Sequence, residues 1–167
     1  MDTFDHKSAP VRPVRLPEVT LAGTTVKIVL QLTGRAYAEM IAHAYDGLPM
    51  EACGLIVGTP GVGANSTAKC SRFVATGNDA NSSKVYTIPP KAHLRAELAA
   101  EDDGFEIIGV MHSHTHTTAY PSPTDVVQAP DPGWHYVIVS LRDDAPVLRS
   151  YRIVDGTVTE EPVTITR

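Results

Sequence analysis

Three histidines alternate in the segment HSHTHTTAYPSPTD, His112 to Asp125, which ends on an aspartate. The preceding residues FEIIGVM (105–111) are short and apolar, which predicts a buried strand. If that strand continues through the segment, His112 and His114 point to one face with Cα atoms about 6.6 Å apart. Two imidazoles so placed can bind one ion at Zn–N distances of about 2.0–2.1 Å. For this pair alone, the alternative is two exposed polar residues at a strand end.

Asp125 strengthens the metal interpretation. The residues Ser122-Pro123-Thr124-Asp125 predict the start of a helix, with Ser122 as N-cap and Pro123 at the first helical position. A simple capping role for Asp125 is compatible with metal binding, because a capped first turn holds the carboxylate rigidly. Two histidines and one aspartate leave a fourth position open, as in catalytic zinc sites. We therefore expect one zinc ion per chain, bound by His112, His114 and Asp125.

The same residues resemble a known family motif. HSH (112–114), ten intervening residues and Asp125, with Ser122 three residues before it, are similar to the motif of the JAMM (MPN+) zinc metallopeptidases. MEACGLIVG (50–58) resembles the glutamate-bearing strand of that family and supplies Glu51. The resemblance covers roughly residues 25–165. It implies an α/β fold, the JAMM/MPN-type α/β/α sandwich in which helices flank a mixed β-sheet.

Catalytic roles follow from this resemblance and from the chemistry of zinc. Zinc lowers the pKa of a bound water to about 7, so that hydroxide forms at neutral pH. Glu51 is expected to take the proton and return it to the leaving amine, while the Ser122 hydroxyl and zinc stabilise charge on the carbonyl oxygen. Taken alone, Glu51 would be a solvated carboxylate at a strand end.

The resemblance also implies a substrate. AYPS (119–122), SYRIVDG (150–156) and VTEEPV (158–163) are most similar to actinobacterial members of the family, which release cysteine from the C-terminal glycine of a ubiquitin-like sulfur carrier during cysteine biosynthesis. The implied partner is a carrier with a Gly-Gly C-terminus, its tail held extended against a strand edge. Three alternatives stay open: trimming of a ThiS-like carrier, a general isopeptidase, and a non-catalytic scaffold. Thr115 departs from the proline that many members have after the second histidine, so loop 115–121 is expected to shape the substrate groove differently.

Several other reactive residues have simpler interpretations. His116 continues the alternation, but the family motif has no ligand there, so we expect a loop residue near the groove and leave metal binding as the alternative. Cys53 is expected to be buried as a small apolar residue, with a Cys–His nucleophile as the alternative. His43, His93 and His135 need only core or surface roles. The HxE…PCxxC pattern of cytidine deaminases does not occur.

Composition narrows the class of protein. The 167 residues suit one domain, and 14 Lys+Arg against 19 Asp+Glu give a net charge of −5 with no basic block, which argues against nucleic acid and anionic membranes as partners. Apolar runs are far shorter than the roughly 20 residues of a membrane span, and the N-terminus lacks a signal core. We therefore expect a cytoplasmic protein in which Cys53 and Cys70 are free thiols, although one disulfide is the alternative.

The elements expected to position these residues alternate between strands and helices. Residues 1–23 contain three prolines and predict a flexible leader before a single domain at 24–167. A helix from Thr33 to about Asp46 should bury a stripe consisting of Tyr37, Met40, Ile41, Ala44, Tyr45 and Leu48. A second helix should begin at Pro89-Pro90 and carry loosely periodic Ala92, Leu94, Leu98 and Ala99. Strands are expected at 24–32, 54–58, 66–78, 84–88, 105–111, 135–141 and 146–154, and again after a tight Asp155-Gly156 turn.

Overall fold

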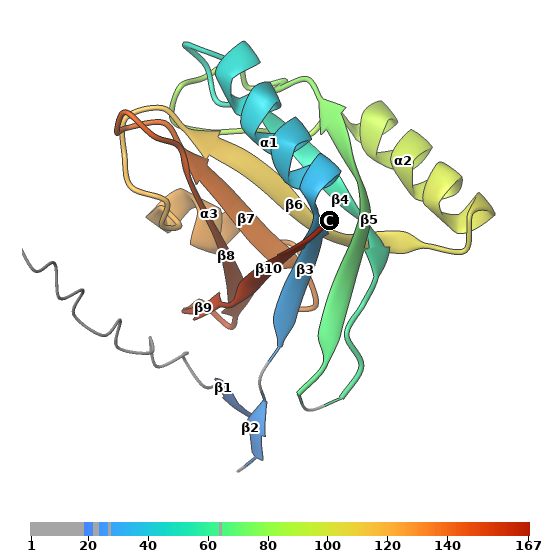
Figure 1. Ribbon diagram of the computed structural model, residues 1–167. Helices are drawn as coiled ribbons and strands as arrows, with labels where there is room; N and C mark the ends of the chain where they lie inside the picture. Colours follow the sequence, from blue (N-terminus) through green and yellow to red (C-terminus); the bar gives the residue numbers. More distant parts are fainter. Residues whose placement is uncertain (1–18, 22–23, 27, 64) are drawn as a thin grey trace, which may run out of the picture.

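The computed structural model describes residues 19–21, 24–26, 28–63 and 65–167. Eight strands form one sheet in the order β10-β3-β5-β4-β6-β7-β8-β9, and β1 and β2 form a separate hairpin (Figure 1). The strands are β1 (Val19–Leu21), β2 (Thr24–Val26), β3 (Val29–Thr33), β4 (Cys53–Thr59), β5 (Thr67–Thr76), β6 (Glu106–His114), β7 (His135–Ser140), β8 (Val147–Val154), β9 (Thr157–Glu161) and β10 (Val163–Thr166). The helices are α1 (Gly34–Asp46), α2 (Pro90–Asp102) and α3 (Pro123–Gln128).

The sheet is mixed, as expected. Strand β3 is parallel to both β5 and β10, and β6 is parallel to β7, whereas the remaining neighbours are antiparallel. Strands β9 and β10 follow one another in the chain but lie at opposite ends of the strand order. Pro162 separates them, since proline has no N–H to donate to a strand ladder. Its carbonyl instead accepts a hydrogen bond from Leu30 N at 3.0 Å. The sheet is therefore curled, with its two edges joined by one residue.

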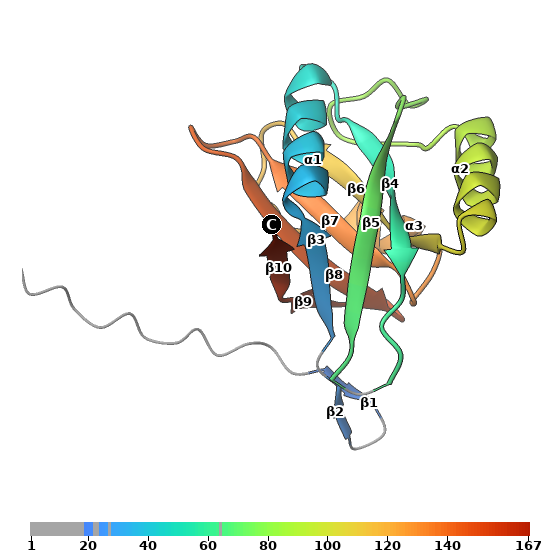
Figure 2. The same ribbon diagram turned by 45° about the vertical axis from the view of Figure 1, so that its right-hand side comes forward.

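Helices cover both faces of the sheet. Helix α1 begins after Thr33, whose hydroxyl accepts from Ala36 N at 3.1 Å, and it packs its buried face against a cluster that includes Met111 and Val137. Helix α2 lies on the other side of β5 and β4 (Figure 2). The alternation along β5 shows this: Phe73 belongs to the α1-side core, whereas Arg72 donates to the Ala99 carbonyl of α2 at 3.0 Å. This arrangement confirms the predicted α/β/α architecture.

Helix α1 also shows where the predicted stripe was wrong. Met40 and Ala44 are buried, as expected, but Tyr45 and Leu48 at the end of the stripe are about half exposed. The buried face that packs on the sheet consists of Ala36, Met40 and Ala44, with Tyr37 and Ile41 partly buried beside it.

In α2 the loosely periodic apolar residues are not the ones that pack on the sheet. Leu94 and Leu98 are exposed, and the small residues Ala96 and Ala100 face the sheet. Small side chains let this helix approach the sheet closely, so the larger leucines lie outside the interface.

Two predicted strands also differ from the structure. Residues 24–32 form two strands, because β2 pairs antiparallel with β1 and only β3 enters the main sheet. Residues 84–88 form an irregular segment with no strand neighbour. The backbone groups of Val85 and Thr87 bind the side chain of Asn78 instead, at 3.1 and 2.9 Å. The proposed leader lies largely outside the described residues, so the boundary at 23/24 stays a prediction.

The predicted hairpin turn and the predicted free thiols match the structure. Both residues of the Asp155-Gly156 turn have positive φ, 48° and 75°, as a tight hairpin requires. Cys53 and Cys70 are both free and buried. In the described part of the chain, every helix is too short or too polar to cross a bilayer.

Candidate metal centre and active site

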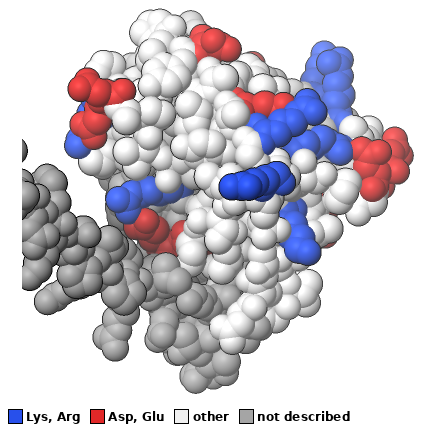
Figure 3. All heavy atoms as spheres, in the orientation of Figure 1, with Lys and Arg blue, Asp and Glu red and all other residues white. Residues whose placement is uncertain are grey.

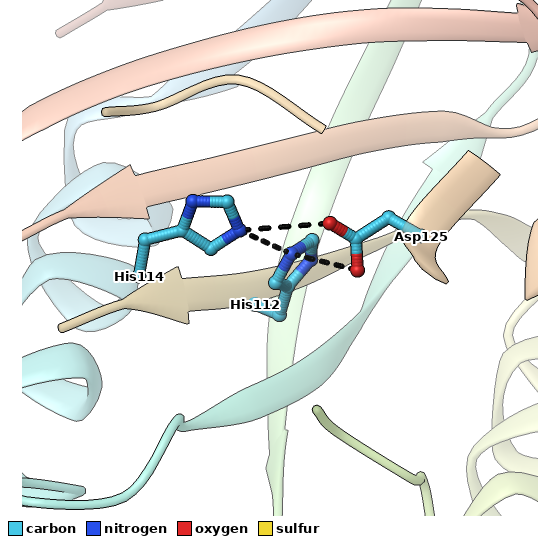
Figure 4. A group of neighbouring side chains, drawn as sticks. All are labelled: His112, His114 and Asp125. Carbon is cyan, nitrogen blue, oxygen red and sulfur yellow. Dashed lines mark hydrogen bonds and ion pairs between the residues drawn. The ribbon is translucent and has the colours of Figure 1, made fainter. Parts of the chain in front are cut away.

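Strand β6 continues past the apolar run and carries both histidines on one face. It pairs with β4 on one side, where Cys53 is opposite His112, and with β7 on the other, where Ser140 is opposite His114. Because β6 is in the middle of the sheet, both imidazoles are held in a rigid frame and are nearly fully buried. Their rings point toward Asp125 (Figure 4).

Asp125 reaches the histidines from the first turn of α3. Ser122 Oγ accepts a hydrogen bond from Asp125 N at 3.2 Å, and Ser122 N donates to Asp125 Oδ2 at 2.6 Å. This reciprocal capping box, together with Pro123 at the start of the helix, fixes the position of the carboxylate. The predicted helix start is confirmed, and the cap holds Asp125 against the sheet.

The three side chains converge at distances suited to one metal ion. His112 Nε2 and His114 Nε2 are 3.1 Å apart, and they lie 3.5 Å from Asp125 Oδ1 and 3.6 Å from Asp125 Oδ2, respectively. A tetrahedral ion with bonds of about 2.0–2.2 Å separates its ligand atoms by roughly 3.3–3.6 Å. The cluster is also the candidate group for metal binding among the described residues. Two imidazoles and a carboxylate are a donor set that suits zinc.

Hydrogen bonds orient the ring of His114. Its Nδ1 lies 2.8 Å from the Thr118 carbonyl oxygen and 2.9 Å from Thr117 Oγ1. An N–H at Nδ1 that donates to the carbonyl leaves the lone pair of Nε2 directed at the cluster, which is the tautomer that a metal ligand needs. His112 is held differently, since its ring stacks on Tyr86 with centroids 4.4 Å apart. His112 Nδ1 is buried with no hydrogen-bond partner among the described residues.

The ionisable side chains of the cluster shift one another's pKa values. Burial would raise the pKa of Asp125, but the neighbouring imidazoles of His112 and His114 and the hydrogen bond from Ser122 N outweigh it and hold that pKa well below its ordinary value. Burial lowers the pKa of His112. For His114 burial acts in the same direction, but the hydrogen bonds to Asp125 and Thr118 raise its pKa overall. Asp125 is thus ionised and His112 neutral, as metal ligands must be.

Glu51 lies just before β4 and is held beside the cluster by its backbone. The neighbouring Ala52 exchanges hydrogen bonds with Ser113: Ala52 N donates to Ser113 Oγ at 2.8 Å, and Ser113 N donates to the Ala52 carbonyl at 2.9 Å. The Asn78 side chain donates to the Glu51 carbonyl at 3.0 Å. These bonds extend the β4–β6 pairing far enough to place Glu51 beside His114.

The Glu51 carboxylate is buried but incompletely bonded. Its Oε2 has no hydrogen-bond partner among the described residues. Burial raises the pKa of Glu51 to about 7, with His114 opposing that rise and Asp125 adding to it. An unpartnered buried oxygen costs free energy, so it is expected to have a partner, such as a water or a substrate atom, in the working protein.

A cavity of about 270 Å³ opens beside the cluster. It is lined by Glu51, Ser83, Lys84, His114, Thr115, His116, Thr117 and Ser122. The predicted site residues Glu51 and Ser122 therefore border the same space as one of the histidines. His116 is exposed, bonds to Thr115 Oγ1 at 2.6 Å through Nδ1, and lies outside the metal-binding group.

The segment 77–89 covers the site, and its sequence did not predict that role. Asn78 anchors this segment to Glu51, and Tyr86 packs on His112. Neither residue belongs to a recognisable sequence motif. The alternating pattern of KVYTI (84–88) predicts a strand instead. Ser113 was not among the predicted site residues, because the metal-binding pattern consists of the two histidines beside it.

The other reactive residues have structural roles. Cys53 donates from Sγ to the Gly77 carbonyl at 3.3 Å, and burial raises the pKa of its thiol, which disfavours the nucleophilic thiolate. His43 Nε2 bonds to the carbonyls of Cys53 and Thr76 at 3.0 and 3.2 Å. His135 Nδ1 bonds to Glu161 at 2.6 Å. These contacts tie strands and helices together.

Comparison with known proteins places the chain among relatives. It is 43% identical over 138 residues to the CysO-cysteine peptidases of Mycobacterium bovis and Mycobacterium tuberculosis, covering 82% of this chain and 91% of theirs. It is 30% identical over 115 residues to a desampylase of Haloferax volcanii, covering 66% and 80% of the two chains.

Solved structures agree with these relatives in fold. A protein of Desulfitobacterium hafniense superposes with a TM-score of 0.75 at 32% identity, covering 83% of this chain and 93% of that one. A protein of Salinibacter ruber superposes with a TM-score of 0.62 at 26% identity, covering 81% and 91%. The sequence profile of the prokaryotic homologs of the JAB domain matches residues 33–154, a range that includes Glu51, both histidines, Ser122 and Asp125. The chain therefore belongs to the prokaryotic branch of the JAB (JAMM/MPN) domain family.

Proposed function

We propose that this protein is a zinc-dependent peptidase that hydrolyses the amide bond between the C-terminal glycine of a ubiquitin-like sulfur carrier and cysteine. One observation carries the proposal: three metal-ligand atoms converge beside a buried, unpartnered Glu51 oxygen. The similarity to CysO-cysteine peptidases at 43% identity supports the substrate class. Release of cysteine fits a role in cysteine biosynthesis in the cytoplasm.

His112, His114 and Asp125 would hold the zinc ion. When bound, zinc supplies a Lewis acid that activates water and polarises the carbonyl of the scissile amide. The capping box of Asp125 and the Thr118 carbonyl that binds His114 keep these side chains in place through the reaction.

Glu51 would move the proton. With a pKa raised by burial to about 7, its carboxylate can accept a proton from the attacking water at neutral pH and then donate it to the leaving amine. Its unpartnered Oε2 is the atom available for this transfer.

Ser122 would stabilise the charge that develops on the carbonyl oxygen. Its Oγ already accepts a hydrogen bond from Asp125 N, so the hydroxyl hydrogen is left to donate. The same side chain thereby caps α3 and serves the reaction.

The carrier would present its Gly-Gly tail in an extended conformation. Backbone pairing with a strand edge is the usual way to hold such a tail, and glycine avoids obstructing a narrow channel. On the face seen in Figure 3, acidic and basic side chains are interspersed, which suits a protein partner better than nucleic acid.

Two substrates distinguish the proposed activity from the alternative activities. CysO extended by a single C-terminal cysteine and CysO extended by a longer peptide would be incubated with the enzyme, and the products weighed by mass spectrometry. We expect rapid release of cysteine and slow cleavage of the longer extension. Equal turnover of both would favour trimming of a ThiS-like carrier or general peptidase activity, and a lysine isopeptide substrate would test the second of these. A non-catalytic scaffold would cleave none of these substrates.

A further inference from the structure

The cavity beside the cluster contains a cation that the proposed reaction has not used. Of the described residues that line it, Lys84 alone is a lysine or arginine, and it shares the cavity with Glu51, His114 and Ser122. Lys84 is exposed and comes from the segment 77–89. The sites of proton transfer and of carbonyl binding thus open into a space that is lined in part by a lysine.

The leaving group of the proposed reaction explains why a lysine would be useful in this cavity. Glu51 returns its proton to the leaving amine, so that nitrogen must lie in the cavity next to Glu51. In a free C-terminal amino acid, the α-carboxylate is only two covalent bonds from the amine nitrogen. The carboxylate of a departing cysteine therefore enters the same cavity, whereas a longer extension would place an uncharged amide there.

Such a carboxylate needs a cation nearby. The cavity is already lined by the Glu51 carboxylate, which repels a second negative charge at close range once it has returned its proton. An ammonium on the wall offsets that repulsion and donates charge-assisted hydrogen bonds, and a lysine is well suited because its flexible stem lets the charge follow the ligand.

We propose that Lys84 binds the free α-carboxylate of the departing amino acid and thereby selects substrates that carry a single residue after the carrier's last glycine. This inference rests on the proposed function and names a specificity-determining residue within it. The backbone around Lys84 supports the assignment, because Lys84 N donates to Ser82 Oγ at 3.1 Å and Glu51 N donates to the Ser82 carbonyl at 2.9 Å. The segment that presents Lys84 is therefore bonded directly to the residue that moves the proton.

The test compares two carriers that differ only in the C-terminal group of the added cysteine, which is a free carboxylate in one and an amide in the other. CysO ending in cysteine with a free carboxylate and CysO ending in cysteine amide would be cleaved by the zinc-loaded enzyme and by Lys84→Met. We expect Lys84→Met to lose roughly 10- to 100-fold in kcat/KM on the free acid and to cleave the amide as the wild type does. Lys84→Arg should recover most of the activity on the acid, and Lys91→Met, which removes an exposed lysine of α2, should leave both substrates unchanged.

A binding measurement adds a readout that is independent of turnover. In a Glu51→Gln background, which keeps the side chain's shape, the Kd for the free-acid carrier should rise when Lys84 is replaced, while the Kd for the amide stays constant. Equal losses on acid and amide, or no loss on either, would overturn the role of Lys84 and leave the peptidase proposal intact. If the wild type released cysteine from neither carrier, the proposed function itself would fail, and this inference with it.

Discussion

The two histidines of the cluster are oriented by different forces. His114 is fixed by hydrogen bonds from its outer nitrogen, whereas His112 is packed within the sheet and stacked on Tyr86. Both are on β6, whose period of two places them on one face. That period, and the cap that fixes Asp125, are local rules, which is why the convergence of these three side chains could be predicted from the sequence.

Replacing His114 should abolish both metal binding and activity. We expect His114→Ala to lose stoichiometric zinc, measured by elemental analysis of the purified protein, because a three-ligand site that loses one ligand binds the ion far more weakly. His116→Ala is the matched control, since His116 is exposed and outside the cluster. Tight zinc binding by His114→Ala, or loss of zinc from His116→Ala, would show that the ligands have been misassigned.

Replacing Glu51 should separate metal binding from catalysis. Glu51→Ala is expected to keep zinc and to lose at least about 100-fold in kcat, because Glu51 is the group that moves the proton in the proposed reaction. Glu106→Ala, which removes an exposed glutamate of β6, should change neither property. Near-normal turnover by Glu51→Ala would contradict the role assigned to this carboxylate.

At the scale of elements, local patterns predicted most of the strands and both long helices. Thr33 and Pro90 mark helix starts, and the apolar runs at 54–58 and 105–111 are central strands, as expected from their composition. The segment 84–88 has a strand-like composition but no strand neighbour to pair with, so its backbone binds a side chain instead. Whether this segment forms a strand depends on tertiary contacts, which the local sequence pattern does not reveal.

Asn78 is expected to hold the segment 77–89 over the site. Its amide nitrogen donates to the carbonyls of Glu51 and Val85, and its amide oxygen accepts from Ala80 N and Thr87 N. Asn78→Asp keeps the acceptor and the shape but removes the two donors. We expect this change to lower the free energy of unfolding by about 1–3 kcal/mol in urea titrations.

The matched variant Asn81→Asp changes an exposed asparagine of the same segment and should have little effect. Activity of Asn78→Asp should also fall, because the backbone of Glu51 loses a hydrogen bond. An unfolding free energy equal to that of the wild type would show that the segment is held by other contacts.

At the scale of the whole molecule, the last strand returns to pair with the first strand of the sheet. Val163 of β10 pairs with Leu30 of β3, and this long-range parallel contact could not be predicted from either segment alone. Strands β4, β6 and β7 lie in the middle of the curled sheet, with neighbours on both sides (Figure 2). The site is therefore built on strands that have little freedom to move.

This buried interior predicts a loss of stability at alkaline pH. Burial raises the pKa of Cys70 from 9.0 to about 12 and the pKa of Tyr151 from 10.0 to about 12. Between about pH 9 and 12 the unfolded chain loses these protons while the folded chain keeps them, so the unfolded state binds fewer protons and stability falls as pH rises. Urea unfolding at about pH 8 and about pH 10.5 should show this decrease.

A variant can identify one source of that pH dependence. Cys70→Ala removes the thiol, so its free energy of unfolding should decline less steeply over the same range. If the wild type were equally stable at both pH values, the buried thiol and phenol would not be protonated in the way the structure implies.

We propose that peptide hydrolysis depends on one divalent cation bound by His112, His114 and Asp125. The most direct measurement is cysteine release from CysO bearing a C-terminal cysteine, followed by mass spectrometry, with zinc content determined on the same samples before chelation, after chelation and after zinc is restored. We predict about one zinc per chain in the active protein, no release after chelation, and recovery in proportion to the zinc bound. Undiminished release of cysteine by the metal-free protein would contradict the account.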